Sequence, residues 1–251
     1  MDELFVEIDS RVALITLDAP ERRNAFTIEM VAELCAALDD LEDNPDVGAL
    51  VITGAPPAFC AGADISHLAR FSGDLPEAER EAELRSIYEG FLRVARSSLP
   101  TIAAVNGPAV GAGMNLALSC DLRIASKAAL FDPKFLDLGI HPGGGHTWML
   151  RRLVGPEVAA ALVLFGESLT GEEAERRGLV WKCVENNELL DTAVELAGRV
   201  ANLATPGLGR KIKRTLVDVG ALDAHDDAVN LEITPQLWSI TQPAFVQRMT
   251  R

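Results

Sequence analysis

Two loops rich in small residues are the segments of this 251-residue chain best suited to chemistry at the backbone. The first, at residues 59–65, reads FCAGADI, and the second, at residues 106–115, reads NGPAVGAGMN. Gly and Ala let a ligand approach the main chain closely, and a helix N-terminus adds unpaired N–H groups. Two such loops facing each other can supply two N–H donors to one carbonyl oxygen. From spacing alone, the simpler alternative is that both are tight strand-to-helix turns.

The elements that must position these loops follow from hydrophobic periodicity. Apolar runs predict an N-terminal hairpin and further strands, and helical spacing predicts three helices between them. The predicted strands are residues 4–8, 12–17, 47–53, 101–105 and 121–125, and the predicted helices are residues 27–41, 77–96 and 111–119. Residues 20–24 form a polar loop, and residues 106–108 carry a turn signal.

After residue 142 the pattern predicts only helices, and Pro235 is expected to kink or break the last one. The predicted helices are residues 147–153, 158–164, 171–177, 189–203, 209–219 and 224–239. We therefore expect a core at residues 1–190 and a C-terminal helical region at residues 191–251, packed on the core or on a neighbouring subunit.

Composition excludes several classes of function. The net charge of −14 and the low pI argue against nucleic acid as a partner and give no polybasic signal for a membrane surface. The four cysteines form no CxxC pair, the N-terminus lacks a signal-peptide pattern, and no run of about 18 apolar residues is present, so we expect a cytoplasmic protein. GxSxG, GxxxxGK[ST] and HExxH motifs are absent, and no metal site is expected.

Six segments, in order along essentially the whole chain, resemble the enoyl-CoA hydratase/isomerase (crotonase) family. They read PERRNAF, AFCAGADI, VNGPAVGAGMNLALSCDLRIAS, LGIHPGGGHTWMLRRLVG, LTGEEAERRGLV and AFVQRM. The resemblance implies an α/β fold, a spiral of ββα units whose C-terminal helices trimerise, giving a homotrimer or a dimer of trimers. It also implies an acyl-CoA thioester as the ligand, with coenzyme A entering as part of the substrate and no separate cofactor.

By motif position, the resemblance assigns the thioester oxygen to an oxyanion hole formed by the backbone N–H groups of Ala63 and Ala112. Attack at C3 or loss of a Cα proton develops enolate charge on that oxygen, which such donors stabilise. The residues placed around the coenzyme A and acyl chain by the same resemblance are Arg22, Arg23, Ala61, Asp64, Ile65, Gly111, Phe135, Phe245 and Arg248. Arg22 and Arg23 are assigned to the phosphates, with solvated surface charges as the alternative.

The sequence departs from the family where proton chemistry is expected. Hydratases of this family use two glutamates, and the matching positions here hold Asn115 and Phe135, the latter in a short helix expected after Pro133. Neither side chain transfers protons at neutral pH. Loss of each acid/base group costs about 10²–10⁴-fold in rate, so ordinary enoyl-CoA hydration is expected to be weak.

Three side chains are candidates to replace the missing glutamates. Asp137 lies two residues after Phe135, and His141 and His146 flank the PGGG turn. Of the two histidines, His141 is favoured as a base from its family position, whereas His146 is expected to bond to loop backbone and, if it opens the next helix, to be neutral. Cys60 is expected to be a small packed residue rather than a nucleophile.

Two hypotheses remain open. One is an acyl-CoA enzyme of fatty-acid or related metabolism that works through a thioester enolate, with atypical or weak hydratase activity. The alternative is a non-catalytic acyl-CoA binding protein that keeps the hole and has lost the acid/base residues.

Overall fold

The computed structural model describes residues 3–64, 66, 69 and 75–250; Ile65, a predicted site residue, lies outside the described residues. The main sheet has the order β1-β2-β3-β4-β6-β9. Its strands are β1 (Leu4–Asp9), β2 (Val12–Leu17), β3 (Ala49–Gly54), β4 (Thr101–Val105), β6 (Leu122–Ser126) and β9 (Lys182–Val184). β1 and β2 form an antiparallel hairpin through Ser10 and Arg11, and all other neighbours are parallel.

A second, smaller sheet runs beside the first, in the order β5-β7-β8. Its strands are β5 (Pro108–Val110), β7 (Leu130–Asp132) and β8 (Leu169–Thr170). β4, β5 and the helix α4 (Ala112–Ser119) form one ββα unit, and β6, β7 and α5 (His146–Phe165) form the next. Each unit places one strand in each sheet. Because β5 directly precedes α4, the start of α4 lies at the smaller sheet.

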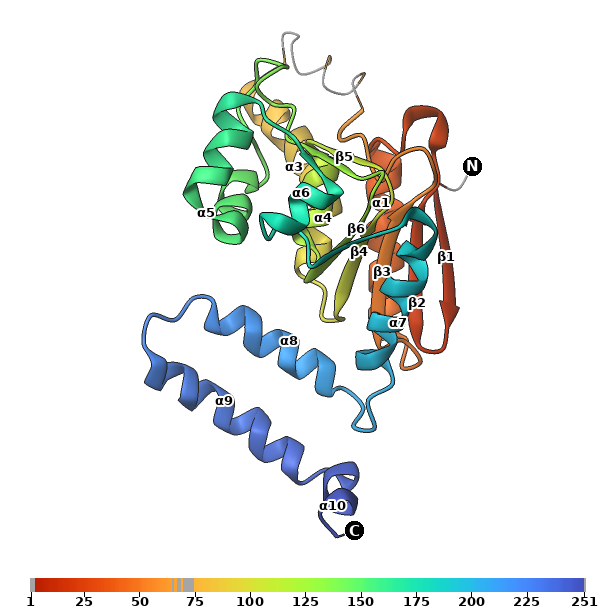
Figure 1. Ribbon diagram of the computed structural model, residues 1–251, viewed down its shortest axis with the longest axis vertical. Helices are drawn as coiled ribbons and strands as arrows, with labels where there is room; N and C mark the ends of the chain where they lie inside the picture. The colour runs from red at the N-terminus through yellow and green to blue at the C-terminus, as the bar shows by residue number, and fades with distance from the viewer. Residues whose placement is uncertain (1–2, 65, 67–68, 70–74, 251) are drawn as a thin grey trace.

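Helices cover both faces of the main sheet (Figure 1). One face packs on α7 (Leu189–Ala201), whose Leu189, Ala193, Ala197 and Ala201 are buried with Val51. The other face holds the larger core under α1 (Ile28–Asp43), α3 (Glu77–Ala95) and α4. The remaining elements of the body are α6 (Gly171–Arg176) and two 3₁₀ turns, η1 (Pro20–Arg22) and η2 (Asn186–Glu188).

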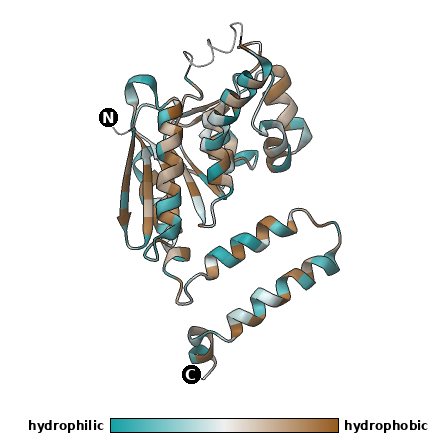
Figure 2. Ribbon diagram, turned by 180° about the vertical axis from the view of Figure 1, so that it is seen from behind, coloured by the Kyte–Doolittle hydropathy of each residue, from teal (hydrophilic) through white to brown (hydrophobic). Residues whose placement is uncertain are grey.

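A helical arm leaves the body after α7 (Figure 1). It consists of α8 (Leu208–Val219), α9 (His225–Ile240) and α10 (Pro243–Met249). Figure 2 shows apolar bands along α8 and α9, and large side chains such as Leu216 and Leu237 are more than half exposed. The expected boundary after residue 190 falls inside α7, which packs on the sheet, so the arm begins at α8.

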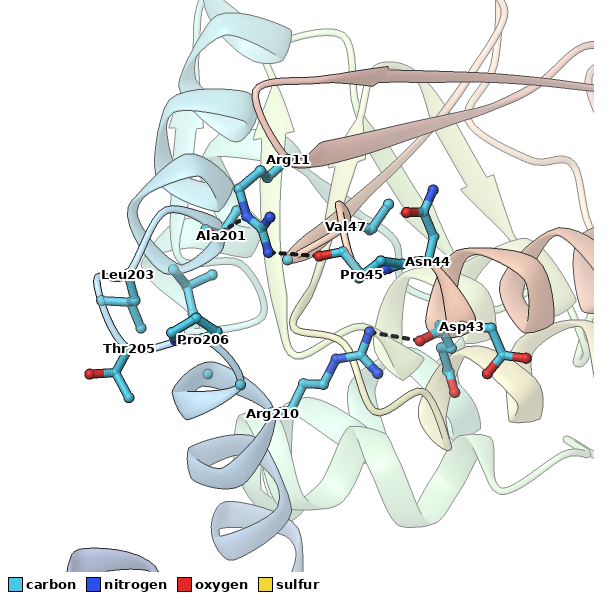
Figure 3. Close-up of a pocket in the computed structure, with 15 residues that line it drawn as sticks. Arg11, Asp43, Asn44, Pro45, Val47, Ala201, Leu203, Thr205, Pro206 and Arg210 are labelled. Atoms are coloured by element: carbon cyan, nitrogen blue, oxygen red, sulfur yellow. Dashed lines mark hydrogen bonds between the residues drawn. The ribbon is translucent and has the colours of Figure 1, made fainter. Parts of the chain in front are cut away.

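Two basic side chains of α8, Arg210 and Lys213, bond the arm to the body. Arg210 donates to the carbonyl of Glu42 and Arg11 donates to those of Ala201 and Pro45, around a cavity of about 440 Å³ (Figure 3). Further along α8, the buried Lys213 donates to the Leu99 carbonyl at 2.8 Å.

Most predicted elements are confirmed, and the exceptions are short. The prediction of helices alone after residue 142 is wrong, because β8 and β9 are strands there. α9 continues through Pro235 without a break. The helix expected after Pro133 is wrong too: Phe135 begins a series of turns, in which the Phe135 carbonyl accepts the Ile140 N–H. No helix in the described part of the chain is long and apolar enough to cross a membrane.

Candidate active site

A buried asparagine fixes the first loop. Asn24 is fully buried at a positive φ of 57°, a conformation that Asn tolerates better than most residues. Its Oδ1 accepts the Ala19 N–H, and its Nδ2 donates to the carbonyls of Ala55 and Ala58, both at 2.8 Å. The amide thereby joins the polar loop after β2 to the loop after β3. Sequence reasoning missed this role, although an Asn inside a polar loop is a signal for left-handed backbone.

The N–H of Ala63 points away from the parallel bridge that Ala63 forms with Phe26. The Phe26 N–H donates to the Gly62 carbonyl at 2.7 Å, and the Asp64 N–H donates to the Phe26 carbonyl at 2.9 Å. In this parallel bridge the N–H of Ala63 points to the opposite side, since neighbouring peptide groups alternate in direction. Among the described residues it has no hydrogen-bond acceptor.

Ala112 supplies a second unpaired N–H group. As the first residue of α4, it has no acceptor one turn earlier. The preceding Gly111 has a φ of 52°, and its own N–H donates to the Asp132 carbonyl at 3.0 Å. This geometry leaves the Ala112 N–H at the helix start, beside the smaller sheet, with no acceptor in the described part of the chain.

The two loops lie against each other. A methyl group on Gly62 would be 2.8 Å from the Val110 oxygen and 3.5 Å from the Ala112 nitrogen, and Gly62 has a φ of +100°. Only glycine fits that combination of close approach and left-handed backbone. The unpaired N–H groups of Ala63 and Ala112 therefore come from adjacent segments, as one carbonyl oxygen between them requires.

A polar pair lies one helical turn beyond Ala112. The side chain of Asn115 is 1% exposed; its Nδ2 donates to the Gly143 carbonyl at 3.1 Å, and its Oδ1 lies 2.7 Å from Nδ1 of His146. The prediction that His146 bonds to loop backbone is wrong, because its partner is this amide. The helix predicted from residue 147 begins one residue earlier, at His146 itself, which is the condition under which a neutral ring was expected.

His146 is held neutral by its surroundings. It is 1% exposed, and burial lowers the pKa of its imidazole to about 4. The Phe135 ring contacts it edge-on, with ring centroids 5.1 Å apart. Nε2 of His146 is buried and has no hydrogen-bond partner among the described residues, an arrangement that costs about 1–3 kcal/mol. Such an orphaned acceptor indicates that a ligand atom or a water molecule completes the site.

The other two candidate bases lie in solvent. Asp137 is exposed and forms an ion pair with Lys134, with Nζ and Oδ2 2.6 Å apart. His141 is exposed, and its Nδ1 lies 2.7 Å from the carbonyl oxygen of Pro142. Neither has a contact with Asn115 or His146 in the described part of the chain, so the geometry does not favour them as bases.

The residues predicted for coenzyme A divide into two groups. Arg23 is exposed and has no ion pair with the described residues, whereas Arg22 lies 2.6 Å from Glu3 and 2.9 Å from Glu21. Arg23 is therefore the freer cation beside the first loop, to which its carbonyl is joined by the Ala61 N–H. Asp64 is half-buried in the first loop and accepts the N–H of Ser66 at 2.8 Å.

The second group lies far from the two loops. Phe245 and Arg248 are exposed on α10, at the far end of the arm (Figure 1). A single chain does not bring them to Ala63 and Ala112. Cys60, by contrast, lies at the first loop but is fully buried, and burial raises the pKa of its thiol to about 12, so it carries no significant thiolate.

Stacked ββα units that bring two unpaired backbone N–H groups together define an α/β protein of the crotonase fold. The family model for enoyl-CoA hydratase/isomerase matches residues 7–232. The chain therefore belongs to the enoyl-CoA hydratase/isomerase family.

Relatives and solved structures agree with this assignment. The chain is 47% identical to a probable enoyl-CoA hydratase, EchA14, of Mycobacterium tuberculosis, over 99% of this chain and 96% of that protein. It is 37% identical to the 1,2-epoxyphenylacetyl-CoA isomerase of Escherichia coli, over 83% of this chain and 80% of that protein. A crystal structure of enoyl-CoA hydratase from Bacillus anthracis superposes with a TM-score of 0.90 at 28% identity, covering 99% of this chain and 95% of that one. These matches confirm the predicted fold.

Proposed function

We propose that this protein binds an acyl-CoA thioester and stabilises its enolate between the backbone N–H groups of Ala63 and Ala112. The observation that carries this proposal is the adjacency of two unpaired donors on neighbouring loops, held by Gly62 and Gly111. A thioester oxygen gains negative charge when a proton leaves Cα, and donors fixed in advance favour that state over the ground state. One such donor contributes about 10²–10³-fold in rate.

Hydration itself is weak in this proposal. The addition of water to an enoyl-CoA requires one group to deprotonate the water and another to protonate Cα. Asn115 and Phe135 occupy the two positions assigned to those groups, and neither transfers protons at neutral pH. The activity expected is thus an enolate reaction with little or no crotonyl-CoA hydration. A fatty acyl chain suits the apolar ring of Phe135.

Coenzyme A is held in this proposal by the exposed Arg23 and by backbone around Ala61, Asp64 and Gly111. Arg22 contributes less, because Glu3 and Glu21 already neutralise it. Phe245 and Arg248 reach the ligand only if the arm of another copy brings them there, in a homotrimer or a dimer of trimers. The apolar, exposed faces of α8 and α9 support such an assembly.

The test combines calorimetry with product analysis. Butyryl-CoA, crotonyl-CoA and free coenzyme A are titrated into the wild-type protein, and crotonyl-CoA is then incubated with it and analysed for 3-hydroxybutyryl-CoA. The expected result is binding of the thioesters that exceeds binding of coenzyme A, with little hydration. Equal affinity for thioesters and free coenzyme A would contradict specific hydrogen bonding of the thioester carbonyl. Normal hydratase turnover would contradict the proposal that hydration is weak.

A non-catalytic acyl-CoA binding protein is the second candidate. It is favoured by the absence of a carboxylate at both position 115 and position 135. Tight thioester binding with neither turnover nor exchange of Cα protons would support it over the enzyme.

A further inference from the structure

His146 is a buried polar group with one nitrogen unused. It opens α5, is 1% exposed, and places Nδ1 2.7 Å from Oδ1 of Asn115. Nε2, on the other side of the ring, is buried and has no hydrogen-bond partner among the described residues. A histidine that only supports the fold is expected to have both nitrogens satisfied.

Hydrogen-bond geometry assigns the proton on this ring. Nδ2 of Asn115 donates to the Gly143 carbonyl, which only accepts, so the amide orientation is fixed. Oδ1 of Asn115 then faces His146 and also only accepts. Nδ1 of His146 must therefore carry the proton, and the neutral ring presents a free lone pair at Nε2. That is the protonation state of a general base.

The groups around His146 keep it in that state. Asn115 contacts it from α4 and Phe135 contacts it from the turns after β7. On the α3 side, the ring of Phe91 and the hydroxyl of Tyr88 pack against the Gly143–Gly144 backbone. The titratable side chain in these contacts is Tyr88, and burial raises the pKa of its hydroxyl, so it is uncharged at neutral pH. No charged group among the described residues contributes to the pKa of His146, which burial lowers to about 4.

The pair lies next to the proposed hole. Asn115 follows Ala112 by three residues in α4, so both lie on the same side of the helix, one turn apart. The Gly111 N–H donates to the Asp132 carbonyl, which ties the helix start to the strand that leads into Phe135. Phe135 in turn contacts His146. The base, the amide and the Ala112 N–H thus belong to one continuous cluster.

We propose that His146 is the general base of this protein and that Asn115 is its positioning residue. This inference rests on the proposed function. Nε2 takes a proton from Cα of the bound acyl-CoA. The electron pair of that C–H bond forms a double bond between Cα and the carbonyl carbon, and the carbonyl π pair moves to the oxygen between Ala63 and Ala112. The imidazolium returns a proton to Cα, or to Cγ of an unsaturated chain. No oxidant, metal or second substrate is required.

A single base predicts a distinct reactivity. Proton exchange at Cα and a 1,3-shift of a double bond need one group that removes a proton and returns it. Addition of water needs a second group, and Phe135 stands where the family places it. The imidazolium formed at His146 exchanges its Nε2 proton with water before returning one to Cα. Wild-type protein is therefore expected to exchange the Cα protons of a saturated acyl-CoA with solvent.

The experiment follows that exchange with butyryl-CoA in D₂O by proton NMR, on the full chain. His146→Gln keeps a polar side chain without a titratable nitrogen and is expected to slow exchange by at least about 100-fold. Butyryl-CoA affinity, measured by calorimetry, is expected to change by less than about threefold, because the backbone donors remain. The matched control is His225→Gln, an exposed histidine on α9, which is expected to exchange at the wild-type rate.

Asn115→Asp tests the positioning role through a pH profile. A carboxylate beside Nδ1 favours the imidazolium, so the acidic limb of the exchange rate is expected to move to higher pH by about one unit or more. A merely structural role of Asn115 lowers the rate without moving that limb. This readout also decides the question if His146→Gln fails to fold, as judged by circular dichroism.

Each contrary outcome overturns a separate claim. Wild-type exchange that persists in His146→Gln, or that is lost instead in His141→Gln, removes His146 as the base and leaves the proposed function intact. Butyryl-CoA that binds the wild-type protein without exchange excludes any base and supports the non-catalytic binder. An unmoved pH profile in Asn115→Asp excludes the pair. Failure of butyryl-CoA to bind at all overturns both this inference and the proposed function.

Discussion

Acidification is expected to destabilise the protein through His146. An unfolded histidine has a pKa of about 6.5, whereas burial lowers that of folded His146 to about 4. Between these values the unfolded chain binds the proton and the folded chain does not. Stability from this group is therefore complete above the unfolded pKa and is lost as pH falls from about 6.5 towards 4.

The magnitude follows from the two pKa values. Lowering the pH from about 7 to about 4.5 is expected to remove about 2 kcal/mol of unfolding free energy through His146 alone, at 1.36 kcal/mol per pKa unit. Urea unfolding of wild-type and His146→Gln at both pH values, at one protein concentration, isolates this contribution, because all other groups titrate in both proteins. A wild-type protein that loses no more stability than the variant would refute the claim that His146 is neutral and buried in the folded state.

Three further predictions address the site. Gly62→Ala is expected to weaken butyryl-CoA binding by about tenfold or more in calorimetry, because the added methyl group enters the contact between the two loops. The control is Gly178→Ala, where φ is also positive, at 75°, but the added methyl group meets open space, and this variant is expected to bind normally. Combined Asn115→Glu and Phe135→Glu substitution is expected to raise crotonyl-CoA hydration by about 100-fold or more, and an unchanged rate would show that the scaffold lacks more than the two acids. The Cys60 thiol, with a pKa raised to about 12, is expected to resist iodoacetamide at pH 8 in the folded protein, as mass spectrometry of the alkylated peptides would show.

The long elements were predictable from sequence because their own residues specify them. β4 is confirmed at residues 101–105, where the apolar run IAAV follows Thr101 and all five residues are buried. α1 carries helical spacing, and Thr27 caps it by accepting the Met30 N–H at 3.0 Å. In both cases a local pattern and the tertiary environment favour the same structure.

The short strands were not predictable in the same way. β8 and β9 contain two and three residues, too few to show a period, and they become strands through partners in β7 and β6. The turns after Pro133 are a similar case. Their hydrogen bonds cross three to five residues, and no apolar period in the sequence distinguishes them from a short helix.

The candidate base was ranked below His141 in the sequence analysis, and the reason is physical as well. Of the two histidines beside the PGGG turn, His141 was favoured from its family position, since burial and hydrogen-bond partners are tertiary properties that the sequence does not show. The structure favours the other histidine. His141 is exposed, whereas His146 is hydrogen-bonded to the side-chain amide of Asn115, 31 residues earlier in the chain. The segment LGIHPGGGHTWMLRRLVG contains His146 but does not indicate which residues the imidazole contacts.

Binding of the thioester oxygen and proton transfer depend on different parts of the proposed site, so either can change without the other. The proposed hole consists of backbone N–H groups, placed by Gly62, Gly111 and the start of α4, so its geometry does not depend on the side chains at positions 115 and 135. Those side chains instead determine the environment of His146. An amide at 115 accepts a hydrogen bond from the Nδ1–H without adding charge, and the phenyl ring at 135 packs edge-on against the imidazole. Two carboxylates at these positions would favour the imidazolium, which has no lone pair to accept a proton. The two departures from the family pattern and the neutral His146 are therefore parts of one arrangement.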